Sequence, residues 1–299
     1  MIMSNFKEKF AEYIKFTEAN LKKYNICSEN SMAQKNLIDA MNYSLEAGGK
    51  RIRPVLTYAF CEALGGDYRN AAAPAAAIEM VHTASLIHDD LPAMDNDDYR
   101  RGKLSCHKKF GEAMGILAGD ALIVLPFEII ADDTALSAEQ KVKIISCLAK
   151  AVGKDGMIGG QVIDMENEER TDVDEANLCN MYKHKTGELI AVSCVMGCIC
   201  AGRNDAETLE NAAEYGYKLG LAFQIVDDIL DVTSTTEELG KPVGSDAEEN
   251  KTTFVTLFGV EKAQEKADAI TDEALECLKK IGGNAFLTEL TEMLLKRKN

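Results

Sequence analysis

The sequence predicts an all-α fold, and three observations support that prediction. First, apolar residues recur close to every 3.6 positions, most clearly in residues 204–231. Second, the sequence contains no convincing run in which apolar and polar residues alternate, as they do in a half-buried strand. Third, its one Asp-Gly pair, Asp155-Gly156, joins two helix-like segments rather than two strands. We therefore expect almost no β-structure.

Capping residues and glycine pairs predict where the helices begin and end. Ser137 with Gln140, and Asp172 with Glu175, have the spacing of a capping box at a helix start. Most interruptions are short enough for consecutive helices to pack as neighbours. The interruptions are Gly48-Gly49, Gly65-Gly66, residues 153–160 and a longer one, residues 233–250, which has the length of a functional loop. We expect a single domain that spans residues 1–299.

The composition is that of a globular protein and limits the kind of ligand. Of the 299 residues, 46% are apolar and 27% are charged, which excludes a disordered or fibrous chain. The formal net charge of −16 argues against partners such as nucleic acid or an anionic membrane, because both need a positive field. A small anionic substrate is compatible with this charge, since local basic residues or a bound cation can reverse the field at one site.

Three further features predict a cytoplasmic protein without stable membrane insertion. Residues 1–21 lack the uninterrupted apolar core of a signal peptide. The most apolar stretch, residues 115–131, is too short and too polar to span a bilayer. Nine cysteines, an odd number, favour reduced thiols. Cys194, Cys198 and Cys200 lie in an apolar run, so we interpret them as buried core residues rather than metal ligands.

The first of two acidic clusters follows a largely apolar stretch and places five aspartates within residues 89–98. Pro92 lacks an amide hydrogen and biases Leu91 away from helical dihedral angles. The helix should therefore loosen here, so that Asp95 can return toward Asp89. Clustered carboxylates repel one another unless they are protonated or neutralised by a cation.

The second acidic cluster lies at residues 227–231. Asp227 and Asp231 are four positions apart, which puts both carboxylates on one face of a helix. Such a pair destabilises a helix unless a hard cation with oxygen ligands lies between the carboxylates. Two clusters of this kind predict a metal site. Mg²⁺ is the expected ion, because it binds few protein carboxylates, keeps its waters and takes substrate phosphates as ligands.

Basic residues gather at four places in this acidic chain, two of them beside the acidic clusters. Phosphate oxygens are their expected ligands, because arginine binds them with a two-pronged fork and lysine as a point charge. The groups are Lys50, Arg51 and Arg53; Arg100, Arg101 and Lys103; Lys183 and Lys185; and Lys241 and Lys251. With the acidic clusters they predict a site for a metal-bound diphosphate and a second anion.

Six sequence blocks resemble the trans-prenyl diphosphate synthases, also called polyprenyl synthetases, and follow the family order from about Met41 to Thr253. The two acidic clusters resemble the family's aspartate-rich motifs, the first in its bacterial and plant form. The blocks are Asp89-Asp90-x4-Asp95 with Arg100-Arg101, Phe223-Gln224-x2-Asp227-Asp228-x2-Asp231, Gly48-Gly49-Lys50-Arg51-x-Arg53-Pro54, Gly160-Gln161-x2-Asp164, Lys185-Thr186-Gly187 and Gly240-Lys241-Pro242-x-Gly244-x-Asp246-x4-Lys251-Thr252.

The resemblance implies the isoprenoid-synthase fold, in which antiparallel helices surround a deep central active-site cavity, and it implies a homodimer. The two acidic motifs would face each other across the mouth of the cavity and hold three Mg²⁺ ions, with Mn²⁺ as a substitute. The implied metal ligands are Asp89, Asp95 and Asp227, assisted by Asp90, Asp164 and Asp231. The implied catalytic residues are Asp89, Asp90, Asp95, Lys185, Asp227 and Asp228.

The substrates implied by the resemblance are isopentenyl diphosphate and an allylic diphosphate, namely dimethylallyl, geranyl or farnesyl diphosphate. Metals and cations stabilise the departing diphosphate, the isopentenyl double bond attacks the allylic cation, and a proton is lost. The residues implied for the allylic diphosphate are Arg100, Lys185, Thr186, Gln224 and Lys241, with Lys251 also expected to bind substrate. Those for isopentenyl diphosphate are Lys50, Arg53, His82 and Arg101.

Three alternative functions match parts of this sequence. A terpene cyclase of the same fold typically carries an Asn/Ser/Glu pattern in place of the second motif, which residues 227–231 do not match. A non-catalytic regulatory subunit of a heteromeric synthase tends to lose acidic motifs, and both are intact here. An HD-type metal phosphohydrolase needs more histidine ligands than the four histidines of this chain provide. The predicted function is therefore that of a prenyl diphosphate synthase with a geranylgeranyl or farnesyl product.

The residues before the first motif predict the length of the product. Farnesyl synthases with this motif tend to place Tyr or Phe five positions before the first aspartate, where this chain has Ala84, followed by Ser85. Ala84 lies roughly 7.5 Å along the helix from Asp89, at about 1.5 Å per residue, where the growing chain would meet it. Small side chains there favour the C20 product, geranylgeranyl diphosphate, over the C15 product.

Ala84→Tyr should shorten the product and preserve the first condensation, because the aromatic ring fills space that alanine leaves open. Chromatography of the dephosphorylated products measures the chain length of both proteins. A C15 end product from the unchanged protein, with isopentenyl diphosphate in excess, would refute the expectation of a C20 product.

Overall fold

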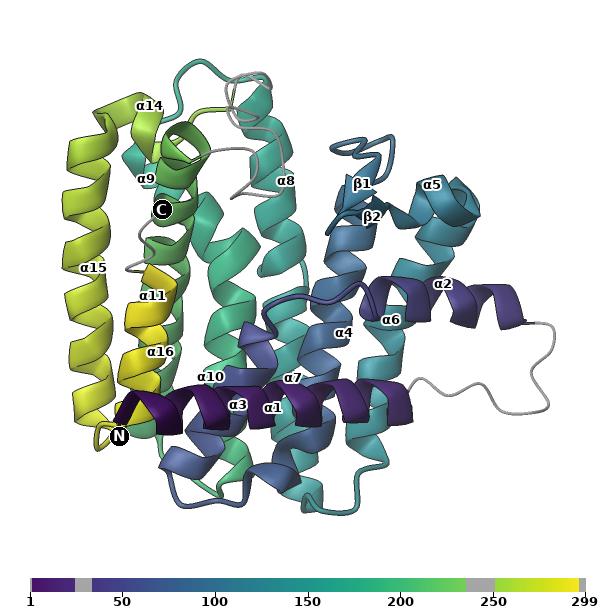
Figure 1. The fold of residues 1–299 in the computed structure, drawn as a ribbon, viewed down its shortest axis with the longest axis vertical. Helices are drawn as coiled ribbons and strands as arrows, with labels where there is room; N and C mark the ends of the chain where they lie inside the picture. The colour runs from purple at the N-terminus through teal and green to yellow at the C-terminus, as the bar shows by residue number, and fades with distance from the viewer. Residues whose placement is uncertain (1, 25–33, 235–250, 296–299) are drawn as a thin grey trace. The chain divides into compact units, whose positions relative to one another are not determined.

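The computed structural model describes residues 2–24, 34–234 and 251–295, and 79% of the structure is helical (Figure 1). The β-structure among them is one antiparallel pair of two-residue strands, β1 (Tyr99–Arg100) and β2 (Lys103–Leu104). The prediction of an all-α fold is therefore confirmed. The chain divides into two compact units: a first unit of residues 1–58 and 67–145, and a second unit of residues 59–66 and 146–299.

The first unit is built on α4, which packs along α6. Every residue from Ala73 to Val81 is buried, because small side chains let neighbouring helices approach α4 from all sides. Helix α1 and helix α2 also contact α4. The helices of this unit are α1 (Ile2–Tyr24), α2 (Lys35–Leu45), η2 (Tyr68–Ala71), α4 (Ala72–Asp89), α5 (Cys106–Phe110) and α6 (Glu112–Ala131), while α3 (Ile52–Ala63) and α7 (Ala138–Val152) contain the boundaries between the units.

The second unit is built on α11, which packs against α10 and α15. A Cβ atom added at Gly216 of α11 would lie 2.4 Å from the Cα of Ala191, so the α10–α11 contact requires a glycine at that position. The helices of this unit are α8 (Met157–Glu168), α9 (Glu175–Tyr182), the π-helical turn η3 (Lys183–Gly187), α10 (Glu188–Cys200), α11 (Ala206–Thr233), α14 (Phe254–Phe258), α15 (Val260–Lys280) and α16 (Ala285–Leu295).

One predicted capping box is present and the other is replaced by a neighbouring cap. The Ser137 amide donates to the Gln140 side chain at 3.0 Å, and the Gln140 amide donates to the Ser137 hydroxyl at 3.3 Å. The capping box predicted at Asp172 was wrong. Asp174 caps α9 instead, because its carboxylate accepts from the Asn177 amide at 2.9 Å, whereas Asp172 accepts from the Arg170 guanidinium.

Two predicted interruptions differ from the structure in extent. The interruption predicted at residues 153–160 ends earlier, since α8 begins at Met157 and contains two of its glycines. Their φ angles fall outside the left-handed region, so these glycines do not break the helix. Most of the loop predicted at residues 233–250 lies outside the described residues.

The apolar run that carries three cysteines lies in α10 and is buried, as predicted. Cys194, Cys198 and Cys200 are at most 7% exposed, and burial raises the pKa of the Cys194 thiol well above its ordinary value. Thiols with raised pKa values are protonated near neutral pH and pack as small apolar groups.

Helix α6 differs from the expectation for its apolar stretch. It spans 20 residues and contains an 18-residue window with a mean hydropathy of 1.9, so by length and composition it is long and apolar enough to cross a membrane. The apolar stretch predicted to be too short for a membrane span begins at Gly115, whereas the helix begins three residues earlier, at Glu112. A core helix of a globular protein meets the same criterion, and α2, α4 and α5 pack against α6. Length and hydropathy therefore do not make α6 a membrane span.

Candidate active site

The first acidic motif lies at the end of α4, where the helix stops at Asp89. The Asp95 amide donates to the Asp89 carbonyl oxygen at 2.9 Å, so the chain returns to the helix end as the sequence predicts. Both aspartates are half-buried, whereas Pro92 between them is exposed. The motif therefore holds two carboxylate residues next to each other at the surface of the first unit.

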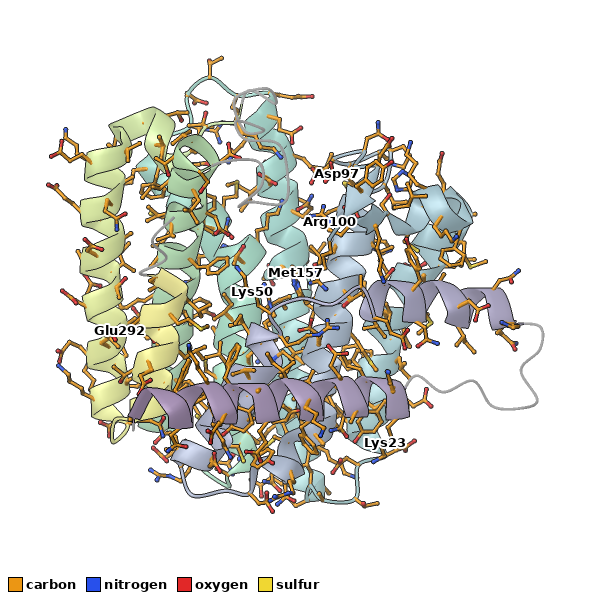
Figure 2. The ribbon with its side chains drawn as sticks, viewed as in Figure 1. Lys23, Lys50, Asp97, Arg100, Met157 and Glu292 are labelled. Carbon is orange, nitrogen blue, oxygen red and sulfur yellow. The ribbon has the colours of Figure 1, made fainter. Side chains whose placement is uncertain are left out.

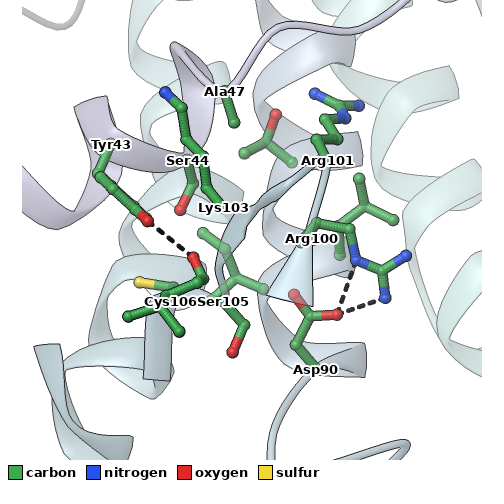
Figure 3. A pocket seen from close by; sticks show the side chains of 13 residues that line it. Tyr43, Ser44, Ala47, Asp90, Arg100, Arg101, Lys103, Ser105 and Cys106 are labelled. Carbon is green, nitrogen blue, oxygen red and sulfur yellow. Dashed lines mark hydrogen bonds and ion pairs between the residues drawn. The ribbon is translucent and has the colours of Figure 1, made fainter. Parts of the chain in front are cut away.

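Asp90 is directed to an arginine of the same motif. Its carboxylate accepts from Arg100 Nε at 2.8 Å and is also contacted by Arg100 Nη2 (Figure 3). Arg100 Nη2 donates to Asp97 as well, at 2.9 Å, and both of these residues are labelled in Figure 2. Burial raises the pKa of Asp90, although Arg100 opposes the rise. The structure thus uses Asp90 to hold the Arg100 guanidinium, and the ladder between β1 and β2 fixes the backbone at Arg100.

The loop before α3 brings a second arginine of the hairpin close to the basic block. Arg101 donates through Nη1 to the Gly48 carbonyl oxygen, and its guanidinium occupies the space that a Cβ atom at Gly49 would fill. Gly48 and Gly49 have φ angles of +87° and +133°, which favour glycine. The two glycines therefore let the backbone turn tightly over Arg101.

Arg53 and His82 are both influenced by the positive charge of Arg101, and both are half-buried. Burial lowers the pKa of Arg53 to about 10, so it stays charged at neutral pH, and its Nε has no hydrogen-bond partner among the described residues. Burial, reinforced by Arg53 and Arg101, lowers the pKa of His82 well below 6.5. His82 is therefore a neutral imidazole beside positively charged guanidinium groups.

Arg51 does not belong to the anion site that its basic block predicts. Its side chain is fully buried and bonded to two glutamates of the first unit, Glu18 and Glu79, each at 2.7 Å. Lys50 and Arg53 on either side of it are exposed and half-buried, respectively. The interpretation of Arg51 as a phosphate ligand is thus wrong, since its donors already have protein partners.

A π-helical turn positions the Lys-Thr-Gly block of the second unit. A Cβ atom at Gly160 of α8 would lie 2.2 Å from the Lys185 amide nitrogen, and one at Gly220 of α11 would lie 2.9 Å from the Gly187 Cα. The turn is therefore held between two helices at distances that only glycine allows. Single π turns inside helices are frequent at functional sites, because they displace side chains from the α-helical register.

Side chains of the matched blocks meet at this turn. The Lys185 ammonium donates to the Asp164 carboxylate, and the Thr186 hydroxyl donates to Gln224 Oε1 at 3.1 Å. Gln224 lies one turn after Gly220 on α11, and Asp227 follows it by three positions. The Gly-Gln-x2-Asp block is thus explained in two ways: Gly160 permits the close approach and Asp164 binds Lys185.

Asp228 and Asp231 are buried, in contrast to half-buried Asp227. The Tyr182 hydroxyl lies 2.9 Å and 3.0 Å from the two carboxylate oxygens of Asp228, and the Phe254 amide donates to one of them at 2.9 Å. Asp228 therefore ties α9 and the start of α14 to α11. Tyr182 was not predicted from the sequence, where its one signal is its place just before the basic residues of the π turn.

A cleft lies over the second acidic motif, within the second unit. It is lined mainly by polar side chains, which suits a charged ligand better than an apolar one. The lining residues that the sequence predicted are Asp164, Lys185, Gln224, Asp227, Asp228 and Lys251. Those that it missed are Asn167, Glu168, Met181, Tyr182, Thr252 and Thr253. The predicted ligand Lys241 lies outside the described residues.

A second, smaller pocket lies under the β1–β2 hairpin of the first unit (Figure 3). Its walls include Asp90, Arg100 and Arg101, and the Tyr43 hydroxyl closes one side by donating to the Leu104 carbonyl oxygen at 2.8 Å. The predicted residues thus form two groups, one in each unit. Among the described residues, no three His, Cys, Asp or Glu side chains cluster as a preformed metal site.

Comparisons with known proteins agree with the motifs. A profile of the polyprenyl synthetase family matches residues 34–286. A farnesyl diphosphate synthase from Micrococcus luteus is 46% identical over 268 residues, covering 89% of this chain and 91% of that protein. A geranylgeranyl diphosphate synthase from Cyanophora paradoxa is 43% identical over 265 residues, covering 88% of each. The structure of a geranyltransferase from Helicobacter pylori, complexed with magnesium and isoprenyl diphosphate, has a TM-score of 0.81 and 34% identity, with 96% of each chain covered.

The chain therefore belongs to the polyprenyl synthetase family. Its all-α architecture is the isoprenoid-synthase fold that the resemblance implied. Within this family it is a prenyltransferase of the farnesyl and geranylgeranyl diphosphate synthase type.

The lowered pKa of His82 predicts a specific pH dependence. In the substrate-free protein, its imidazole should titrate well below 6.5 in NMR spectra, with the resonance assigned through His82→Gln. The unfolded chain binds this proton more readily than the folded one. The free energy of unfolding should therefore fall as the pH drops below about 6.5, and His82→Gln should reduce this fall. A titration midpoint at or above 6.5 would contradict the cationic surroundings described for His82.

Proposed function

We propose that the chain catalyses the divalent-metal-dependent, head-to-tail condensation of isopentenyl diphosphate with allylic diphosphates. One observation carries this proposal most directly. In a chain with a net charge of −16, Arg53 and Arg101 lie beside a neutral His82, and a buried donor of Arg53 has no partner among the described residues. This cluster of side chains suits a strongly anionic ligand, because one guanidinium group can donate two parallel hydrogen bonds to phosphate oxygens. Lys50, Arg53, His82 and Arg101 are the proposed ligands of isopentenyl diphosphate.

The acidic motifs fit Mg²⁺ by the chemistry of their donors. Each motif offers carboxylate oxygens, and the bond from the Asp95 amide to Asp89 holds two of these residues together. The lack of a preformed three-residue cluster among the described side chains agrees with an ion that takes one or two carboxylates and completes its shell with water and phosphate. Asp89, Asp95 and Asp227 would hold the metal ions, and Mg²⁺ would stabilise the charge that develops on the departing diphosphate.

The carboxylates that accept hydrogen bonds from protein groups have supporting roles in this proposal. Asp90 orients Arg100, Asp164 orients Lys185, and Asp228 ties α14 to α11. Lys185, Thr186 and Gln224 are the proposed ligands of the allylic diphosphate in the second unit, where Lys251 also lines the cleft. Arg100 is the proposed diphosphate ligand of the first unit. Fixed cations of this kind favour ionisation of the allylic carbon–oxygen bond, because they need not reorganise as charge builds on the diphosphate. We propose that residues 1–299 act together as one catalytic domain.

We propose C20 geranylgeranyl diphosphate as the main product, with C15 farnesyl diphosphate as the alternative. Ala84 and Thr83 are buried in α4, whereas Ser85 is half-buried. Ser85 is four positions before Asp89 and three after His82, so it lies on the same helical face as these two proposed site residues. The small side chain of Ser85 supports a longer product on this face, whereas Ala84 is packed against protein atoms.

We propose that the protein is a cytoplasmic homodimer that associates through α6. Ile116, Leu117 and Val124 are 47%, 52% and 65% exposed, and their spacing places them on neighbouring positions of one helix face. An apolar face of this kind is typical of a subunit interface. Sedimentation analysis should give about twice the chain mass of 32.7 kDa, and Val124→Glu should shift it toward the monomer. A monomer at micromolar concentration would refute the dimer.

Removing the metal or its proposed ligands should abolish the condensation. Purified protein incubated with Mg²⁺, isopentenyl diphosphate and dimethylallyl diphosphate should form longer prenyl diphosphates, detected by chromatography after dephosphorylation. Asp89→Ala and Asp227→Ala should each lower turnover by about a hundredfold or more, because the metal loses a ligand in the transition state. Glu210→Ala, an exposed change on the same helix as Asp227, is the matched control. Full activity in excess EDTA would exclude this mechanism.

A further inference from the structure

Arg51 differs from the other cations of its loop, because its charge is balanced inside the protein. Its Nε and Nη1 donate to Glu18 of α1 and Glu79 of α4, each at 2.7 Å, and its Nη2 donates to the Leu45 carbonyl oxygen at 2.5 Å. The side chain is fully buried. All of its contacts therefore stay within the first unit, and none of them points to substrate.

The backbone of Arg51 is in a conformation that its side chain must hold. Its φ angle is +50°, in the left-handed region that non-glycine residues seldom adopt. Such a conformation persists only where the surrounding contacts determine it. Lys50 comes directly before Arg51, and Arg53 follows two positions after it. The hydrogen bonds of Arg51 therefore also fix the backbone that carries these two proposed ligands of isopentenyl diphosphate.

Glu79 connects the ion pair that it forms with Arg51 to the proposed site of isopentenyl diphosphate. It is 1% exposed and lies one helical turn before His82. Its negative charge acts on Arg53 and Arg101 as well as on Arg51, and it opposes the lowering of their pKa values by burial. A buried carboxylate without its hydrogen-bonded partner is costly, so it seeks the nearest remaining donors. Arg53 and Arg101, the guanidiniums proposed to bind isopentenyl diphosphate, lie within the influence of this charge.

We propose that Arg51 is a positioning residue for isopentenyl diphosphate: it engages Glu79 and thereby leaves Arg53 and Arg101 available to the substrate. This inference rests on the proposed function. It assigns Arg51, which lies within the basic block, a role opposite to that of its neighbours. Lys50 and Arg53 bind the anion, whereas Arg51 keeps an internal anion from competing with it.

A double-mutant cycle on Arg51 and Glu79 tests this proposal. Calorimetry in the presence of Mg²⁺ gives the dissociation constants of isopentenyl diphosphate and of dimethylallyl diphosphate separately. Arg51→Gln should weaken the binding of isopentenyl diphosphate about tenfold or more, the size expected for losing a charge-assisted contact, and change that of dimethylallyl diphosphate by less than about twofold. Arg51→Gln/Glu79→Gln should bind isopentenyl diphosphate within about threefold of Glu79→Gln alone, because the competing carboxylate is gone.

Three outcomes would overturn the proposal. They are unchanged affinity of Arg51→Gln for isopentenyl diphosphate, equal weakening for both diphosphates, and a double variant no better than Arg51→Gln. The matched control is Arg69→Gln, which changes an exposed arginine of the same unit that is paired with Asp67, and it should leave both constants unchanged. Circular dichroism and the thermal midpoint show whether each variant is folded.

If Arg51→Gln does not fold, Arg51→Lys provides the test. Lysine has a single ammonium group in place of the three donor nitrogens that Arg51 uses for Glu18, Glu79 and the Leu45 carbonyl, so it should engage Glu79 only in part. Isopentenyl diphosphate should therefore bind several-fold less tightly and dimethylallyl diphosphate as before. Equal weakening, or none, would overturn the proposal. A failure of the proposed function would be recognised separately, because the unchanged protein would then form no prenyl product and bind neither diphosphate.

Discussion

The repulsion between like charges is the constraint on which the rest of this structure depends. The chain gathers aspartates at the ends of two helices and guanidiniums around one tight loop, and neither gathering is stable without compensation. Ion pairs within the protein supply part of this compensation: Asp90 pairs with Arg100, Asp164 pairs with Lys185, and Arg51 pairs with two glutamates. A ligand that carries both signs, a metal ion together with a diphosphate, is the kind of ligand that we propose for the remaining charges.

This division of roles explains why adjacent residues of one motif differ in environment. Asp227 is half-buried and lines the cleft of the second unit, while Asp228 is buried and bonded to Tyr182 and Phe254. In the same way, Arg51 faces inward between Lys50 and Arg53. On a helix or in a loop, neighbouring side chains point in different directions. A motif of consecutive like charges can therefore hold one group for chemistry and one for the scaffold.

The sequence predicted the fold class and the family, because helical periodicity and the spacing of the motif residues are local properties of the chain. The return of Asp95 toward Asp89 could also be predicted, since Pro92 restricts the residue before it. The partners of Arg51 could not, because Glu18 and Glu79 are 33 and 28 positions away. Nor could the cap at Asp174, since Asp172 offers the same chemistry two residues earlier and only the backbone decides between them.

The glycines around the π turn limit how this site can vary. At Gly160 and Gly220 a single added carbon would overlap backbone atoms of the turn, and backbone cannot rotate aside as a side chain can. Both positions therefore admit one amino acid out of twenty. Side chains that the turn displays, such as Thr186 with its partner Gln224, are not restricted in this way. Substitutions meant to alter specificity should therefore be made at the side chains that the turn displays, and the glycines that hold the turn should be kept.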